Sequence, residues 1–169
     1  MILSKYNLYL WAFLLTFYFA IISHAKGVTC PSCMHALLMT HNLPSEQKYE
    51  MYKIMLPVLK LSDDKCESGN TVPKVCKTTQ ITSLIVHKCQ TKNFTLKAFG
   101  MKNMFPDADL EVRVMMRECV SELSGNAFMC TKLGVVDYTL PKEIRIPLNQ
   151  LEALWQNVTY TGDLCRYSG

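Results

Sequence analysis

Two cysteines separated by two residues, Cys30-Pro31-Ser32-Cys33, carry the chemistry that this sequence offers most plainly. Such a pair can exchange electrons, supply two ligands to a metal ion, or form disulfide bonds with other cysteines. A redox pair typically opens a helix within a βαβ pattern, and no such pattern follows. A zinc site needs a second closely spaced pair of ligands, whereas Cys66 and Cys76 lie too far apart. The motif therefore favours disulfide bonds, and we expect no metal or other cofactor.

The remaining polar side chains give no indication of catalysis. The sequence contains no G-x-S-x-G motif, which would place a nucleophilic serine on a sharp turn. The acidic pairs Asp63-Asp64 and Asp107/Asp109 lie in turn-like segments, where aspartate is favoured for backbone reasons. Beyond the first 25 residues the only histidines are His35, His41 and His87, and none has a suggestive neighbour in sequence. We expect a protein that is not an enzyme.

Residues 1–25 have the pattern of a secretory signal peptide. Lys5 precedes an uncharged apolar run over residues 8–22, and Ser23-His24-Ala25 supplies small residues for cleavage. An uncleaved anchor is the alternative, but the run is shorter than the roughly 20 residues that span a bilayer. The chain ends without the hydrophobic tail of a lipid-anchor signal. We therefore expect one domain, residues 26–169, that is soluble and extracellular.

All eight cysteines follow the expected leader, which is consistent with a disulfide framework formed in an oxidising compartment. Eight cysteines allow 105 pairings, and spacing alone does not choose among them. Two sequons, Asn93-Phe94-Thr95 and Asn157-Val158-Thr159, predict N-linked glycans on Asn93 and Asn157. The net charge of +4 comes from scattered lysines and arginines, so we expect no nucleic-acid partner.

The segments that must position these residues show two kinds of periodicity. Residues 30–38 fit a helix by the spacing of Cys30, Cys33 and Met34, whereas Val28 and Thr29 favour a strand, so both readings stay open. Residues 46–56 predict a helix that Pro57 ends or kinks. Residues 78–86 are rich in β-branched side chains and predict a strand.

The clearest pattern is an alternation of apolar and polar residues on both sides of a turn-rich segment. It covers residues 94–98 and 110–116 and predicts a long β-hairpin with one buried face. Further on, residues 142–146 fit another strand, and Asn149 could begin one short helical turn. Because a long, thin hairpin exposes much of its surface, we expect disulfides to hold the domain together in place of a large apolar core.

With the cysteines and their neighbours taken together, the chain resembles the lymphocyte-antigen-six/urokinase-receptor superfamily, which has the three-finger fold, and in particular an invertebrate branch linked to olfactory neurons. Four short patches carry the likeness: TCPSC (29–33), DDKCESGNTVPKVC (63–76), VRVMMRECVSEL (112–123) and TGDLCR (161–166). The resemblance implies a mainly β, small, disulfide-rich three-finger-like domain. The long interval between Cys33 and Cys66 would then be a helical insertion in the first finger.

The resemblance also implies a disulfide pairing, which is Cys30–Cys89, Cys33–Cys66 and Cys76–Cys119. The family usually carries two adjacent cysteines before the last one, and this chain has Thr159 and Tyr160 there. Without those partners, Cys130 and Cys165 are expected to bond to each other. Arg166 stands where the family has an asparagine that ties the fingers together, so that tether is absent or replaced.

Relatives in this superfamily bind or modulate receptors and ion channels through their loops. The resemblance therefore implies a secreted, non-enzymatic protein that binds an extracellular or membrane receptor or channel. The candidate contact is the hairpin tip, where Met101, Met104 and Phe105 lie in a turn with little core nearby. The alternative is a saposin-like lipid-binding domain, which would explain the helical spacing of Cys30 and Cys33 but would have to be dominated by helix.

Overall fold

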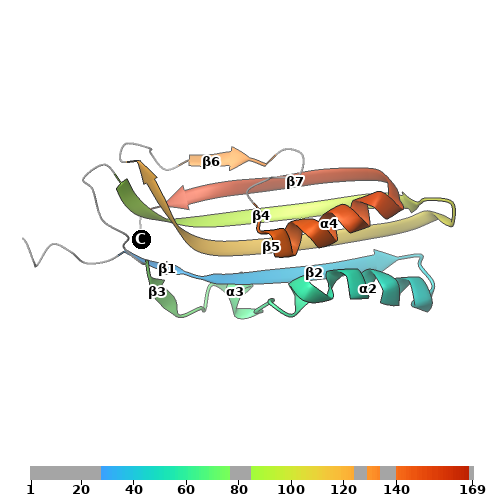
Figure 1. Cartoon of the computed structure of the whole chain (residues 1–169), viewed down its shortest axis with the longest axis horizontal. Coiled ribbons are helices and arrows are strands. Elements are labelled where there is room, and N and C mark those ends of the chain that lie inside the picture. Colours follow the sequence, from blue (N-terminus) through green and yellow to red (C-terminus); the bar gives the residue numbers. More distant parts are fainter. Residues whose placement is uncertain (1–27, 77–84, 124–128, 134–139, 168–169) are drawn as a thin grey trace, which may run out of the picture.

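The computed structural model describes residues 28–76, 85–123, 129–133 and 140–167, and these form a five-stranded antiparallel sheet, a small two-stranded sheet and three helices (Figure 1). The five strands, in the order in which they lie side by side, are β2 (Cys33–His41), β5 (Phe105–Leu123), β4 (Ile85–Met101), β7 (Trp155–Tyr167) and β6 (Met129–Lys132). The two-stranded sheet at one end consists of β1 (Thr29–Pro31) and β3 (Pro73–Val75). The expected leader and most of the strand expected at 78–86 lie outside the described residues.

The hairpin of β4 and β5 forms the centre of the large sheet, which confirms the hairpin expected from the alternation. Its pairing runs from Ile85 opposite Leu123 to Met101 opposite Phe105, so it is longer than expected. Phe94, Leu96 and Ala98 are buried while the residues between them face the other side. Asn103 adopts a left-handed φ of 61° in the turn, which asparagine tolerates better than most residues do.

The residues around the C-x-x-C motif are extended, which settles the choice between helix and strand. β1 and β2 are separated by Ser32, and β2 pairs with β5 along its whole length. The helix expected at 46–56 is confirmed as α2 (Ser45–Leu59), although it continues past Pro57. Met51, Met55 and Val58 are buried, and this burial accounts for the continuation of the helix beyond the proline.

Residues 142–146 form a helix and not the expected strand. They begin α4 (Lys142–Leu154), which also contains Asn149 in its interior. The alternation of Ile144 and Ile146 suggested a strand, but Ile146 is 53% exposed. Ile144 belongs instead to a helical stripe with Leu148 and Leu151, each no more than 1% exposed.

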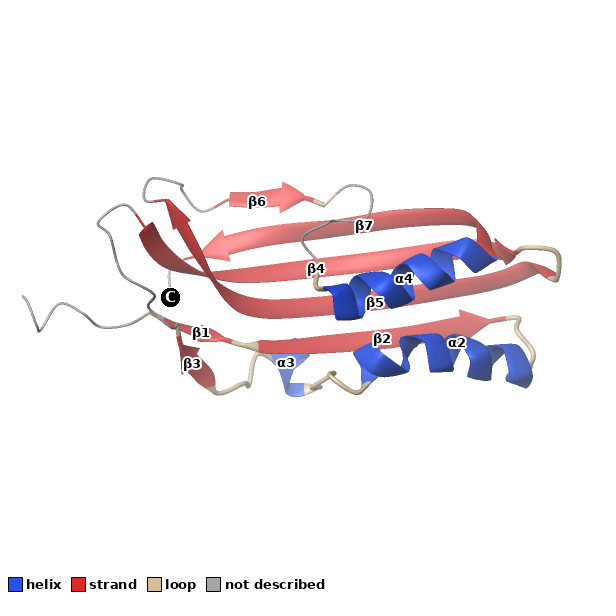
Figure 2. Ribbon diagram, viewed as in Figure 1, coloured by secondary structure: helices blue, strands red, loops and turns tan. Residues whose placement is uncertain are grey.

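The two longer helices pack against each other on one face of the five-stranded sheet, as Figure 2 shows, and an apolar core lies between the two layers. The core joins side chains of α2 and α4 to those of β2, β4 and β5, and it includes Trp155, which is 1% exposed. The expectation that disulfides would stand in place of a large core was wrong, because the helices cover one face of the hairpin. We call the opposite face of the five-stranded sheet the open face.

Four disulfide bonds connect the same pairs that the resemblance implies: Cys30–Cys89, Cys33–Cys66, Cys76–Cys119 and Cys130–Cys165. Cys89 and Cys119 are direct neighbours on β4 and β5, and the sulfur atoms of Cys30 and Cys76 lie 3.5 Å apart. Two adjacent bridges therefore fasten the two-stranded sheet to the central hairpin.

The domain has the expected fold class: mainly β, small and disulfide-rich, with the helix α2 inserted between Cys33 and Cys66. Strands make up 56% of the described residues and helices 26%, so the helix-dominated fold that the saposin-like alternative requires does not fit. Within the described ranges, no helix is long and apolar enough to cross a membrane.

Candidate binding surface

The tip of the β4–β5 hairpin is firmly attached to the end of α4. The backbone N–H of Lys102 donates to the carbonyl oxygen of Leu154 at 3.0 Å, and its Nζ donates to that of Ala153 at 2.9 Å. These bonds satisfy carbonyl groups that the last turn of a helix leaves without a partner. The tip is therefore held in one position relative to the helix layer.

Only one of the three side chains expected to form a contact at this tip is well exposed. Met101 is 4% exposed and belongs to the core, so the expectation that it lies in the turn with little core nearby was wrong. The reason is the irregularity at Gly100, whose φ of 74° shifts the register and turns Met101 toward the helices. Phe105 is half-buried against the core, and Met104 is 55% exposed.

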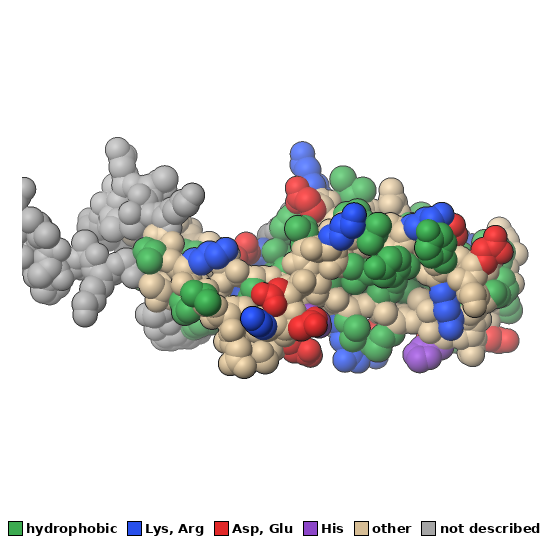
Figure 3. All heavy atoms as spheres, turned by 90° about the horizontal axis from the view of Figure 1, so that it is seen from below, with side chains coloured by type: hydrophobic (Ala, Val, Ile, Leu, Met, Phe, Trp, Pro, Cys, Tyr) green, Lys and Arg blue, Asp and Glu red, His purple; other side chains and the backbone are tan. Residues whose placement is uncertain are grey.

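A groove between α2 and α4 offers a larger apolar surface. It has a volume of about 400 Å³ and is lined by Lys53, Ile54, Pro57, Lys142, Glu143, Ile146, Pro147 and Gln150. Ile146 is 53% exposed, and Tyr49, with Lys53 Nζ 4.8 Å from its ring centre, is 59% exposed. In Figure 3, hydrophobic side chains lie exposed among charged ones on the side of the molecule that carries α2. We call the groove between α2 and α4 the helix groove.

The helix groove could not be predicted from the sequence, because its two walls are about 90 residues apart in the chain and meet only through packing of the helices. α4 is held in place by Tyr160 of β7, whose hydroxyl donates to Glu152 Oε2 at 2.8 Å and whose ring packs on Phe94. Burial, followed by this hydrogen bond and the charge of Glu152, raises the pKa of Tyr160. The one available signal was Ile146, an apolar residue on the polar side of α4.

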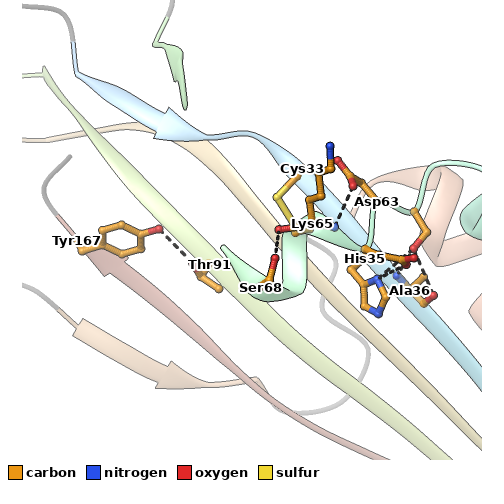
Figure 4. The surroundings of a disulfide bond; sticks show 11 residues. Cys33, His35, Ala36, Asp63, Lys65, Ser68, Thr91 and Tyr167 are labelled. Atoms are coloured by element: carbon orange, nitrogen blue, oxygen red, sulfur yellow. Dashed lines mark hydrogen bonds and ion pairs between the residues drawn. A yellow bond between two sulfur atoms is a disulfide. The ribbon is translucent and has the colours of Figure 1, made fainter. Parts of the chain in front are cut away.

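A second group of polar residues gathers beside the Cys33–Cys66 bridge (Figure 4). The bridge brings α3 (Lys65–Ser68) and the residues before it against β2, so that His35 Nδ1 lies 3.4 Å from both Ser62 Oγ and Asp64 Oδ1. His35 Nε2 lies 3.7 Å from a carboxylate oxygen of Glu67. This group could not be predicted from the sequence, since His35 is far in the chain from the residues that surround it.

The geometry of this group suits attachment of the segment to β2. Ser62 Oγ and Asp64 Oδ1 both approach Nδ1 of His35, whereas Glu67 approaches Nε2 from α3. The Ser62 hydroxyl accepts a bond from the Ala36 N–H at 2.9 Å, and the Asp63 N–H donates to the Met34 carbonyl at 2.7 Å. These bonds fasten residues 62 and 63 along the outer edge of β2.

The two sequon asparagines both lie exposed on the open face. Asn93 is in the middle of β4, and not at the base of the hairpin as the expected hairpin bounds would place it; Asn157 is on β7. A hollow of about 420 Å³ near the tip end of this face is lined by His41, Lys97, Ala98, Phe99, Asp109, Leu110, Glu111, Asn157 and Thr159. Both asparagines are therefore accessible in the folded chain.

The cysteines of the opening motif are each joined to a different distant cysteine. Because Cys30 is bonded to Cys89 and Cys33 to Cys66, neither thiol is available as a metal ligand or as half of a redox pair. The motif thus serves to attach β1 and β2 to the rest of the domain. No family model, no curated protein and no solved structure matches this chain.

Proposed function

We propose that this protein is exported and that it binds an extracellular or membrane protein, such as a receptor or channel, without catalytic activity. The leader-like residues 1–25, the four disulfides and the resemblance to the three-finger superfamily support export to an oxidising compartment and a binding role. The observation that carries the binding role is the helix groove, which is lined by apolar side chains among charged ones and leaves Ile146 exposed.

The helix groove has the properties of a preformed contact. Ile146 lines the groove, and the exposed ring of Tyr49 lies against Lys53, which also lines it. The helices beneath are fixed by buried side chains such as Met55 and Leu148, each 0% exposed. A surface that is already ordered loses little conformational freedom on binding, which favours affinity. Exposed tyrosine and aliphatic side chains surrounded by charges are typical of protein interfaces. Met104, at the hairpin tip, is the remaining exposed apolar residue of the loop contact that the sequence predicts.

Binding of the labelled, exported protein to cells, compared among single variants, tests this proposal. We expect Ile146→Ser to weaken binding about tenfold, which corresponds to about 1.4 kcal/mol. Val72→Ser is the matched control, because Val72 is 83% exposed but lies outside the groove, between α3 and β3. Met104→Ser reports whether the hairpin tip also contributes.

The outcomes separate the competing readings. Binding that survives Ile146→Ser but is lost in Met104→Ser would show that the contact lies at the hairpin tip and not in the helix groove. Binding that persists on protease-treated cells and on protein-free phospholipid vesicles would favour a lipid partner over a protein. Absence of cell-surface binding by the unaltered protein would contradict the proposal.

A further inference from the structure

A sequon asparagine and an exposed aromatic ring lie directly opposite each other on the open face. Asn157 of β7 pairs in register with Phe99 of β4, and both side chains point to the open face. Side chains at directly opposed positions of an antiparallel pair have Cβ atoms about 4.5–5.5 Å apart. Phe99 is 52% exposed, and Phe99, Asn157 and Thr159 all line the hollow of about 420 Å³.

Phe99 is one of several large apolar residues exposed in the described part of the chain, and covering its ring would recover part of the free energy of burial. The pyranose ring of a sugar has one face made mainly of C–H groups, which can lie flat on the electron-rich face of an aromatic ring. A sugar attached to Asn157 begins next to Phe99 and is confined by the same hollow. Its hydroxyl groups would meet polar neighbours, since Lys97 and Glu111 also line the hollow.

We propose that Asn157 carries an N-linked glycan whose first N-acetylglucosamine packs against Phe99 in this hollow. The inference rests on the export part of the proposed function, because the transfer takes place in the secretory pathway. In that transfer Asn157 Nδ2 forms a bond to C1 of the sugar, the amide loses a proton, and the bond between C1 and the phosphate of a polyprenyl-pyrophosphate donor breaks. The exposed position of Asn157 lets the folded domain accommodate the product.

The second sequon places another glycan on the same face. Asn93 is exposed on β4, where its direct neighbours are Met115 of β5 and Asp163 of β7. The helix groove lies on the opposite side of the sheet, beyond the core. Glycans on Asn93 and Asn157 would thus shield the side of the sheet that no long helix covers and leave the groove accessible to a protein partner.

The test combines glycan mass with thermal stability for the full chain expressed in cells with a secretory pathway. Asn157→Gln is expected to remove one glycan from the intact mass, and Asn93→Gln the other. In the glycosylated protein, Phe99→Ala is expected to lower Tm by about 3 °C more than it does in the Asn157→Gln background. Phe99→Tyr keeps an aromatic face, so the Asn157 glycan is expected to raise the Tm of this variant as it does that of the parent. Phe99→Leu has no aromatic ring, so this gain in Tm is expected to be lost.

Two results would overturn the inference: an Asn157 that stays unmodified in exported protein, or an equal effect of Phe99→Ala in both backgrounds. A second preparation with a foreign leader placed before the full chain separates this inference from the proposed function. Asn157 glycosylated behind the foreign leader, but no export with the chain's own residues 1–25, would count against the proposed export alone. A glycosylated protein that binds no cell would count against the proposed binding alone.

Discussion

Among single residues, Tyr160 shows how a polar contact between two elements fixes the geometry of the candidate surface. Its hydroxyl bonds to Glu152 of α4 while its ring remains against Phe94 on the sheet. A bond of this kind between a hydroxyl and a carboxylate orients a helix more sharply than apolar packing alone, because it is directional. The position of the helix groove thus depends in part on one phenol.

Replacing Tyr160 with phenylalanine is expected to lower the free energy of unfolding by about 1 kcal/mol at neutral pH. The pKa of Tyr160 is raised in the folded protein, so the phenol keeps its proton at a pH where the unfolded chain, with a pKa of about 10, releases it. The stability contributed by Tyr160 is therefore complete below about pH 10 and declines above it. Denaturant unfolding at about pH 8 and pH 10.5 should show that the difference in the free energy of unfolding between parent and variant is smaller at the higher pH. A larger difference at the higher pH would contradict this role of Tyr160.

Met101 and Met104 provide a matched pair of methionines three residues apart. Met101→Ala removes a core side chain and is expected to cost about 2–5 kcal/mol, whereas Met104→Ala is expected to stay within about 0.5 kcal/mol of the parent. Thermal unfolding of the two variants measures both values. Similar losses in both would show that the tip is packed differently.

Met101 and Met104 also show how far the sequence predicts which side chains are buried. The alternation along 94–98 correctly identified Phe94, Leu96 and Ala98 as the buried side of β4. It could not give the orientation of Met101, because one irregular residue, Gly100, changes the face that every following side chain occupies. Backbone irregularities of this kind depend on tertiary pairing and have no periodic signal.

Among the elements, β7 and β4 approach each other closely at Gly162, which lies opposite Phe94. A Cβ atom at position 162 would collide with the carbonyl oxygen of Asn93 and would lie 3.2 Å from the Cα atom of Phe94. Both are backbone atoms, which cannot move aside as a flexible side chain can. Glycine at this position is required for the close pairing of the two strands.

Gly162→Ala is accordingly expected to destabilise the domain by about 1–3 kcal/mol through overpacking. The neighbouring Thr161→Ala, on the same strand, is the control and should have little effect. Urea titrations of both variants provide the comparison. An unchanged midpoint for Gly162→Ala would mean that β7 can shift away from β4 without loss.

Helices were harder to predict than strands, and α4 shows why. Its first five residues contain apolar side chains at alternate positions, and a stretch this short fits a strand and a helix equally well. Only the continuation through Leu148 and Leu151 identifies the helical stripe. In α2 the apolar spacing extends over several turns, so the sequence was sufficient. The helix groove lies between α2, which the sequence predicts, and α4, which it does not. The groove therefore could not be predicted from the sequence.

In the whole molecule, disulfides and an apolar core share the work of stabilisation. The two adjacent bridges at Cys89 and Cys119 hold the two-stranded sheet, whereas the core lies between the large sheet and the helices. Stability is therefore distributed over two regions of the domain. The sequence indicated the number of cysteines but not this division, because the order of the strands depends on contacts between distant segments.

Replacing both Cys30 and Cys89 with alanine is expected to cost about 2–5 kcal/mol and to leave a folded domain, since the second bridge and the core remain. Removing Cys76 and Cys119 as well should detach the two-stranded sheet while the core of the large sheet persists. Near-ultraviolet circular dichroism and limited proteolysis would report the two steps. Complete unfolding after loss of the first bridge alone would show that the core cannot hold the domain.

The contacts of Ser62 and Asp63 along β2 have a consequence for the protein at high concentration. An outer strand with free N–H and carbonyl groups is a template onto which another chain can add, and repetition of that step leads to fibres. The Met34 carbonyl already accepts from the Asp63 N–H, and the Ala36 N–H already donates to the Ser62 hydroxyl. The first part of β2 is thereby closed to strand addition by another chain, which limits self-association through this part of the edge in a crowded compartment.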